Sequence, residues 1–105
     1  MFDLYLFVVG NIFVDDENMK PKEYQMLAFQ LEKKGEKEKA RRVYEEALEK
    51  HPGDSILLHN FGVLLEEMED WDEAERRYRE LIKHDPEDFD GHYMLGRLLR
   101  KRGRY

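Results

Sequence analysis

The chain has 105 residues, of which 40% are charged and 41% hydrophobic, so it forms one small domain with a modest core. Its net charge of -6 disfavours nucleic acid or an anionic membrane surface as the default partner. The absence of cysteine excludes disulfides, thiolate metal sites and thiol nucleophiles, and it suits a reducing compartment. We therefore expect a cytoplasmic protein.

The first twenty residues form an apolar segment for which the sequence leaves two structures open. A glycine-asparagine pair at 10–11 between apolar flanks is a two-residue turn signal and predicts a β-hairpin. The helical spacing of Leu4, Phe7 and Val8 predicts a short capping helix instead. The segment lacks the basic start of a secretory signal and is too short to span a bilayer, so we expect no membrane partner.

A repeat follows this segment. Residues 21–54 and 55–88 align without a gap at an offset of 34, and a third copy begins at residue 89 and runs to residue 105. Identical residues at matching positions include Ala40 and Ala74, Tyr44 and Tyr78, and Pro52 and Pro86. Apolar residues in each copy recur at intervals of three and four, which is the helical period. We therefore expect a repeat domain over 21–105, with two helix pairs and the first helix of a third.

The helices expected in chain order follow from this periodicity and from the helix breakers. Gly35 separates the first two helices, while Pro52 and Pro86 follow the second and fourth. Ser55 is placed to cap the third helix. The expected helices are 21–34, 36–50, 55–69, 71–84 and 89–101.

The pattern within each unit resembles the tetratricopeptide repeat, which has fixed positions for large and small residues on two antiparallel helices. In the middle unit these positions hold Leu58, Phe61, Gly62, Leu65, Ala74, Tyr78, Leu81 and Pro86. The resemblance implies an all-α fold, an α-α superhelix whose first helices line a concave face. It also implies that Gly62 and Gly96 allow a close approach between helices.

The first unit also resembles the half-tetratricopeptide repeat of RNA-processing complexes. This resemblance rests on the run from Ala40 to Leu48. The last segment carries several basic residues and a single acid, Asp90, which would suit contact with RNA. A scaffold in an RNA-processing complex is therefore the alternative function, although the acidic net charge makes nucleic acid the less favoured partner.

Few residues have the chemistry that an enzyme needs. Ser55 is the only Ser or Thr hydroxyl, and its place after a Pro-Gly-Asp turn indicates a helix cap. The four histidines do not share a helix at metal-binding spacing, and no glycine-rich phosphate loop is present. We therefore expect no catalysis, no metal and no cofactor.

The family resemblance implies a partner-binding groove along the outward-facing positions of the first helices, among them Glu66. The partner would be an extended peptide or a helix of another protein. The residues predicted to contact it are Gln25, Phe29, His59, Val63, Tyr93, Arg97 and Arg100. A clamp for acidic chaperone tails is disfavoured, because Gln25, Phe29, Asp90 and Met94 replace its basic and amide residues.

The third unit has one helix, which predicts self-association. A repeat leaves an apolar face for its neighbour, so this helix would expose Leu95, Leu98 or Leu99 unless another chain covers them. We therefore expect a homodimer or a higher oligomer.

Overall fold

The computed structural model describes residues 6–9, 12–15 and 19–103, with side chains described from Met19 onward. Strands β1 (Leu6–Val9) and β2 (Ile12–Asp15) pair antiparallel, with Leu6 opposite Asp15. The sequence left open a β-hairpin or a short capping helix for this segment, and the backbone of residues 6–9 and 12–15 forms the paired strands of a hairpin. The turn at 10–11 lies outside the described residues.

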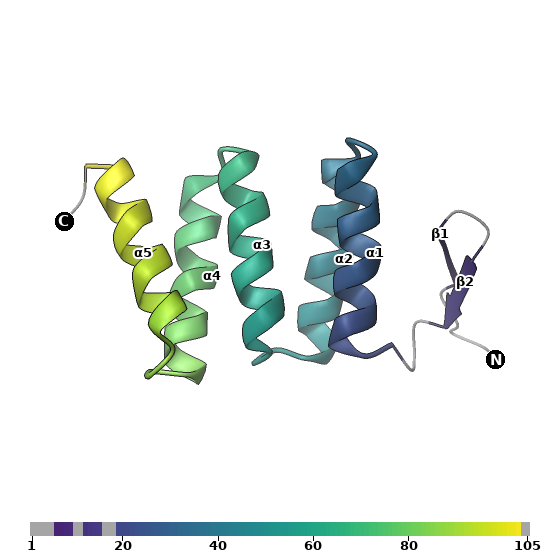
Figure 1. Ribbon diagram of the computed structural model, residues 1–105, viewed down its shortest axis with the longest axis horizontal. Helices are drawn as coiled ribbons and strands as arrows, with labels where there is room; N and C mark the ends of the chain where they lie inside the picture. Colours follow the sequence, from purple (N-terminus) through teal and green to yellow (C-terminus); the bar gives the residue numbers. More distant parts are fainter. Residues whose placement is uncertain (1–5, 10–11, 16–18, 104–105) are drawn as a thin grey trace.

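Five helices make up the rest of the chain. They are α1 (Pro21–Lys33), α2 (Lys37–Lys50), α3 (Ser55–Glu67), α4 (Trp71–His84) and α5 (Phe89–Lys101). Each helix packs on its neighbours in sequence, and Figure 1 shows α1, α3 and α5 in front of α2 and α4. This is the all-α arrangement of stacked helix pairs that the sequence predicts. The bounds of α4 and α5 are those expected, and those of the other three differ by one or two residues at one end.

Aspartates begin three of the helices. The side chains of Asp54, Asp70 and Asp88 accept hydrogen bonds from backbone amides in the first turns of α3, α4 and α5. The prediction that Ser55 caps α3 is therefore wrong, because Ser55 is the first helical residue and Asp54 is the cap. An aspartate satisfies a free amide and also places negative charge at the positive end of the helix dipole.

The core runs through both helix pairs and reaches α5. Phe61, Tyr78 and Leu98 are fully buried. Of the three leucines of α5 among which the sequence predicted an exposed one, Leu98 is therefore excluded, while Leu95 and Leu99 are partly exposed.

A Cβ at Gly62 would lie 2.3 Å from Cε1 of Tyr78, so the close approach of α3 and α4 requires glycine at this position. Gly96 differs, since a Cβ placed there would have no heavy atom of the described residues within 4 Å apart from its chain neighbours and the backbone of its own helix.

Candidate binding groove

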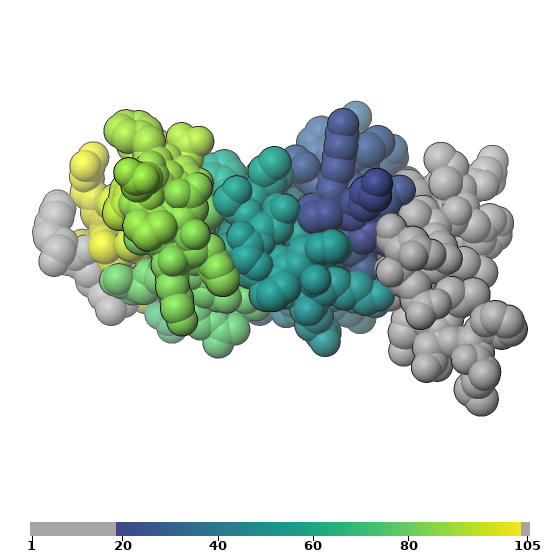
Figure 2. Space-filling view, turned by 90° about the horizontal axis from the view of Figure 1, so that it is seen from below, coloured from purple at the N-terminus to yellow at the C-terminus, as the bar shows by residue number. Residues whose placement is uncertain are grey.

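The exposed apolar side chains gather on the first helix of each unit. Among the residues whose side chains the structure describes, the exposed large hydrophobic ones all lie on α1, α3 and α5. They are Met26, Phe29, Ile56, Phe89 and Tyr93, with exposed fractions of 55% to 79%. The surfaces of α2 and α4 instead carry ion pairs within one helix, such as Arg79 with Glu75. In Figure 2 the upper outline of the molecule dips at the teal surface of α3, between the light green surface on the left and the blue surface on the right.

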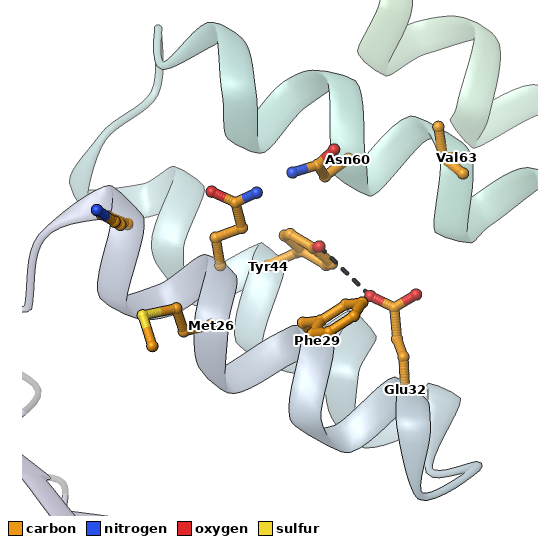
Figure 3. Close-up of a pocket in the computed structure, with 8 residues that line it drawn as sticks. Met26, Phe29, Glu32, Tyr44, Asn60 and Val63 are labelled. Atoms are coloured by element: carbon orange, nitrogen blue, oxygen red, sulfur yellow. Dashed lines mark hydrogen bonds between the residues drawn. The ribbon is translucent and has the colours of Figure 1, made fainter.

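A pocket of about 480 Å³ lies between α1 and α3. Figure 3 shows Tyr44 of α2 at its base. The pocket brings together three residues predicted to contact a partner, Gln25, Phe29 and Val63. The ammonium of Lys33 lies 5.4 Å from the centre of the Phe29 ring. The full lining consists of Lys22, Gln25, Met26, Phe29, Glu32, Tyr44, Asn60 and Val63.

Within this pocket Tyr44 and Glu32 form a polar pair. The hydroxyl of Tyr44 donates a hydrogen bond to Oε2 of Glu32 over 3.4 Å. Burial, reinforced by the charge of Glu32, raises the pKa of Tyr44 well above its ordinary value, so the phenol keeps its proton and acts as a donor. Burial and then the charge of Glu67 raise the pKa of Glu32, while the Tyr44 hydrogen bond and the charge of Lys37 oppose that rise.

The second unit has the equivalent pair, one repeat further along the chain. Tyr78 donates a hydrogen bond to Oε2 of Glu66 over 2.5 Å. Two cations of α5 also reach this carboxylate, with Arg97 Nη2 lying 3.0 Å from Oε2 and Lys101 Nζ lying 3.6 Å from Oε1. The Glu66 side chain is only 6% exposed, so the prediction that it faces outward is wrong. Arg97, predicted to contact a partner, makes an ion pair within the chain.

The remaining predicted contact residues lie apart from the first pocket. His59 lines a second, smaller pocket of about 200 Å³, together with Ile56 of α3 and two aspartates at the start of α5. The His59 Nδ1 atom lies 3.2 Å from Oδ1 of Asn60, which lines the first pocket, so the two pockets adjoin. Tyr93 is 59% exposed on α5, and Arg100 is exposed on the same helix.

Sequence reasoning missed the chemical centre of the first pocket. The pattern marked Tyr44 only as a repeated position, and it did not place Glu32, Met26 or Asn60 among the residues predicted to contact a partner. The 34-residue offset holds the missing signal, because it places a Glu and a Tyr at matching positions in both units. A repeated polar pair on facing helices indicates a contact rather than two unrelated surface residues.

The described residues show neither a metal centre nor a membrane span. Across residues 19–103, no group of three or more His, Asp or Glu side chains has the arrangement that a metal ion needs. None of the helices that the structure describes has the length and apolar character required to cross a bilayer.

Comparison with known proteins links the chain to one family. Two family profiles described as tetratricopeptide repeat match residues 21–64 and 59–105, and together they cover all five helices. Comparison with curated proteins found no match.

Two solved structures are similar to the chain in fold. One is MamA, from residue 41 to its end, of Desulfovibrio magneticus RS-1, which is 25% identical with a TM-score of 0.68. The other is the ArsTM double mutant of MamA from RS-1, which is 24% identical with a TM-score of 0.69. In each case the match covers 76% of this chain and 45% of the other, so this chain spans less than half the length of those proteins.

Proposed function

Because the chain belongs to the tetratricopeptide repeat family, we propose that it is a protein-interaction scaffold whose groove on α1, α3 and α5 binds a segment of a partner protein. The placement of the exposed apolar side chains carries this proposal. In the part of the chain with described side chains, they lie on the first helices, while α2 and α4 carry ion pairs. Exposed aromatic and methionine side chains next to a pocket are typical anchors of an interface.

The chemistry of the groove favours an extended peptide or a helix as the bound segment. The first pocket offers the apolar surfaces of Met26 and Phe29 beside the polar groups of Asn60 and Glu32. Such a mixture fixes the position of a ligand through a few polar contacts while apolar contacts supply most of the affinity.

Selection of short random peptides displayed on phage, with the full chain as bait, tests this proposal. Selected peptides should bind the Phe29→Ala variant at least about tenfold more weakly, because an exposed aromatic anchor is lost. The matched control is Arg76→Ala on α4, where a side chain that is 65% exposed is removed from the opposite layer and binding should not change. The proposed groove on α1, α3 and α5 would be contradicted if the selection yielded no binder. It would also be contradicted if the binders were sensitive only to the change on α4.

We also propose that the chain self-associates through the face of α5 that has no covering helix among the described residues. The equivalent face of α3 buries Phe61 and Leu65 fully, whereas their counterparts Leu95 and Leu99 on α5 remain partly exposed. A second copy would cover this apolar surface. Sedimentation velocity should show a mass above that of the monomer as concentration rises, and Leu99→Lys should lower it. A monomer mass at every concentration would refute self-association.

The alternative of an RNA-processing scaffold gains less support from the basic residues near the C-terminus. Arg102 pairs with Asp72 at 2.7 Å and with Glu75 at 2.9 Å. Arg97 and Lys101 pair with Glu66. Because these cations neutralise acids of the preceding unit, fewer charges are left to bind phosphates.

A further inference from the structure

The first helices of successive units meet at two junctions, α1 with α3 and α3 with α5. Each junction contains a hydrogen-bonded Tyr-Glu pair, but the charges around the two pairs differ. Tyr44 donates to Glu32 at the junction of α1 with α3, and Tyr78 donates to Glu66 at the junction of α3 with α5. In the second case the guanidinium of Arg97 completes the site by binding the same carboxylate oxygen that Tyr78 binds. The second junction therefore shows that a guanidinium fits beside a Tyr-Glu pair on these two helices.

The first junction lacks that cation. One repeat earlier than Arg97 and Lys101 stand Val63 and Glu67, so a neutral and an acidic residue replace two basic ones. Among the residues that the structure describes, no basic side chain lies within ion-pair distance of Glu32, and Glu67 pairs with Lys37 instead. Val63 is too short and too apolar to neutralise the carboxylate. Space is left in its place, since Val63, Glu32 and Tyr44 all line the pocket.

We propose that the pocket between α1 and α3 receives an arginine side chain of the partner peptide, which binds the carboxylate of Glu32 as Arg97 binds that of Glu66. This inference rests on the proposed function and adds the chemistry of the ligand. A guanidinium is the group of choice here, because it is planar, always charged and weakly hydrated, and it packs on aromatic faces. The ring of Phe29, which is 58% exposed beside Glu32, offers such a surface, and the ammonium of Lys33 at 5.4 Å from the ring centre shows that this ring attracts positive charge.

The electrostatics of the pocket agree with a missing cation. Burial and the charge of Glu67 raise the pKa of Glu32. The water that burial removes from this carboxylate is therefore not fully replaced by positive charge from the chain. Lys37 opposes this rise without forming an ion pair with Glu32. A ligand guanidinium would supply the compensation that the chain does not.

The two ends of the pocket also differ in charge, with Lys22 at one end and Glu32 at the other. Lys22 lines it as well, ten residues before Glu32 on α1, which corresponds to about 15 Å along the helix axis. A peptide with its arginine at Glu32 would therefore meet positive charge at the other end of the pocket. Such a separation favours a segment in which an acidic residue accompanies the arginine and fixes the direction of the chain.

Two libraries of short random peptides that differ at one fixed position, arginine in one and citrulline in the other, test this proposal on the full chain. Citrulline has nearly the shape of arginine and carries no charge. Peptides selected from the arginine library should bind at least about tenfold more tightly than their citrulline counterparts, because a charge-assisted pair is lost in the latter.

Three variants locate the effect. Glu32→Gln should remove the preference for arginine while keeping an acceptor for Tyr44. Val63→Arg should remove it as well, by placing the chain's own guanidinium on Glu32 as Arg97 is placed on Glu66. Glu38→Gln, which neutralises an exposed acid of α2, should leave the preference unchanged.

The outcomes separate this inference from the proposed function. If groove-binding peptides are selected but arginine and citrulline bind equally, the groove stands and the arginine site is refuted. If neither library yields a peptide whose binding depends on Phe29, both the groove and the arginine site are refuted. Circular dichroism of each variant shows whether a lost preference reflects a lost fold.

Discussion

The hydroxyl of Tyr78 donates a hydrogen bond to the buried carboxylate of Glu66 over 2.5 Å. This contact joins the two helices of the second unit and also holds the acid that α5 binds through Arg97. It therefore links packing within a unit to packing between units. The equivalent contact of Tyr44 with Glu32 is longer, at 3.4 Å, and lies in the open pocket.

Removal of the Tyr78 hydroxyl should destabilise the chain more than removal of the Tyr44 hydroxyl. Tyr78→Phe removes one of the two donors to Oε2 of the buried Glu66 and leaves Arg97 as the other, and losing this hydrogen bond to a charged group should cost about 1–3 kcal/mol of unfolding free energy. Tyr44→Phe should cost less than about 1 kcal/mol, because water reaches the carboxylate of Glu32. Urea denaturation of the two variants measures the difference, and equal losses would contradict the distinction between a closed and an open site.

Arg97 should contribute to stability, whereas Arg100 should not. Arg97→Ala leaves the buried Glu66 with a more distant cation, Lys101, and we expect a loss of about 2 kcal/mol. Arg100 is exposed on the same helix, so Arg100→Ala should change the unfolding free energy by less than about 0.5 kcal/mol. Thermal denaturation of the pair provides the measurement. Similar small effects would show that Arg97 is free to contact a partner, as the sequence suggested.

Alanine should have opposite effects at the two equivalent glycines. Gly62→Ala places a Cβ against the Tyr78 ring, and the required shift should cost about 1–3 kcal/mol. Gly96→Ala meets no neighbour in the described part of the chain and should stabilise α5 by about 0.5–1 kcal/mol through helix propensity. Both are measured in dilute solution, where self-association is weakest. Destabilisation by Gly96→Ala would indicate that a helix does cover this face.

Glu32 should make stability depend on pH in a direction opposite to that of a typical ion-paired acid. Its folded-state pKa is raised above 4.5, so the folded chain holds the proton more tightly than the unfolded chain does. Stability then falls as pH rises from 4.5 through the folded pKa, and the loss persists at neutral pH.

The variant Glu32→Gln should remove this contribution. It should be more stable than the natural chain at neutral pH, and the difference should disappear below the ordinary pKa of the acid. Urea denaturation across this range checks the sign. A variant that is less stable at neutral pH would mean that Glu32 already has adequate positive charge nearby.

The sequence was sufficient for the helices but not for the contacts between units. The 34-residue period and the helix breakers predicted α4 and α5 to the residue, because helix bounds follow from local spacing and turn chemistry. The roles of Glu66 and Arg97 could not be found in this way, since they depend on how closely α5 approaches α3. Both were predicted to face outward, and the structure pairs them at 3.0 Å.

The pocket itself was predicted only in part. Gln25, Phe29 and Val63 occupy family positions that line a groove, so the pattern alone placed them together. The role of Glu32 depends on the lack of a basic side chain paired with it among the described residues. That lack becomes evident only when the structure shows Arg97 paired with Glu66 at the equivalent junction. Asp54, rather than Ser55, caps α3 because the side chain one residue before the helix has the geometry to reach Leu57.

Amide chemical-shift mapping with a peptide selected from the arginine library tests the central claim most directly, because it locates the bound segment on the chain. Binding to the groove predicts that shifts gather on α1 and α3 around Phe29, Glu32 and Val63, and that they are lost in Val63→Arg. Shifts confined to the outer surfaces of α2 and α4 would contradict the account.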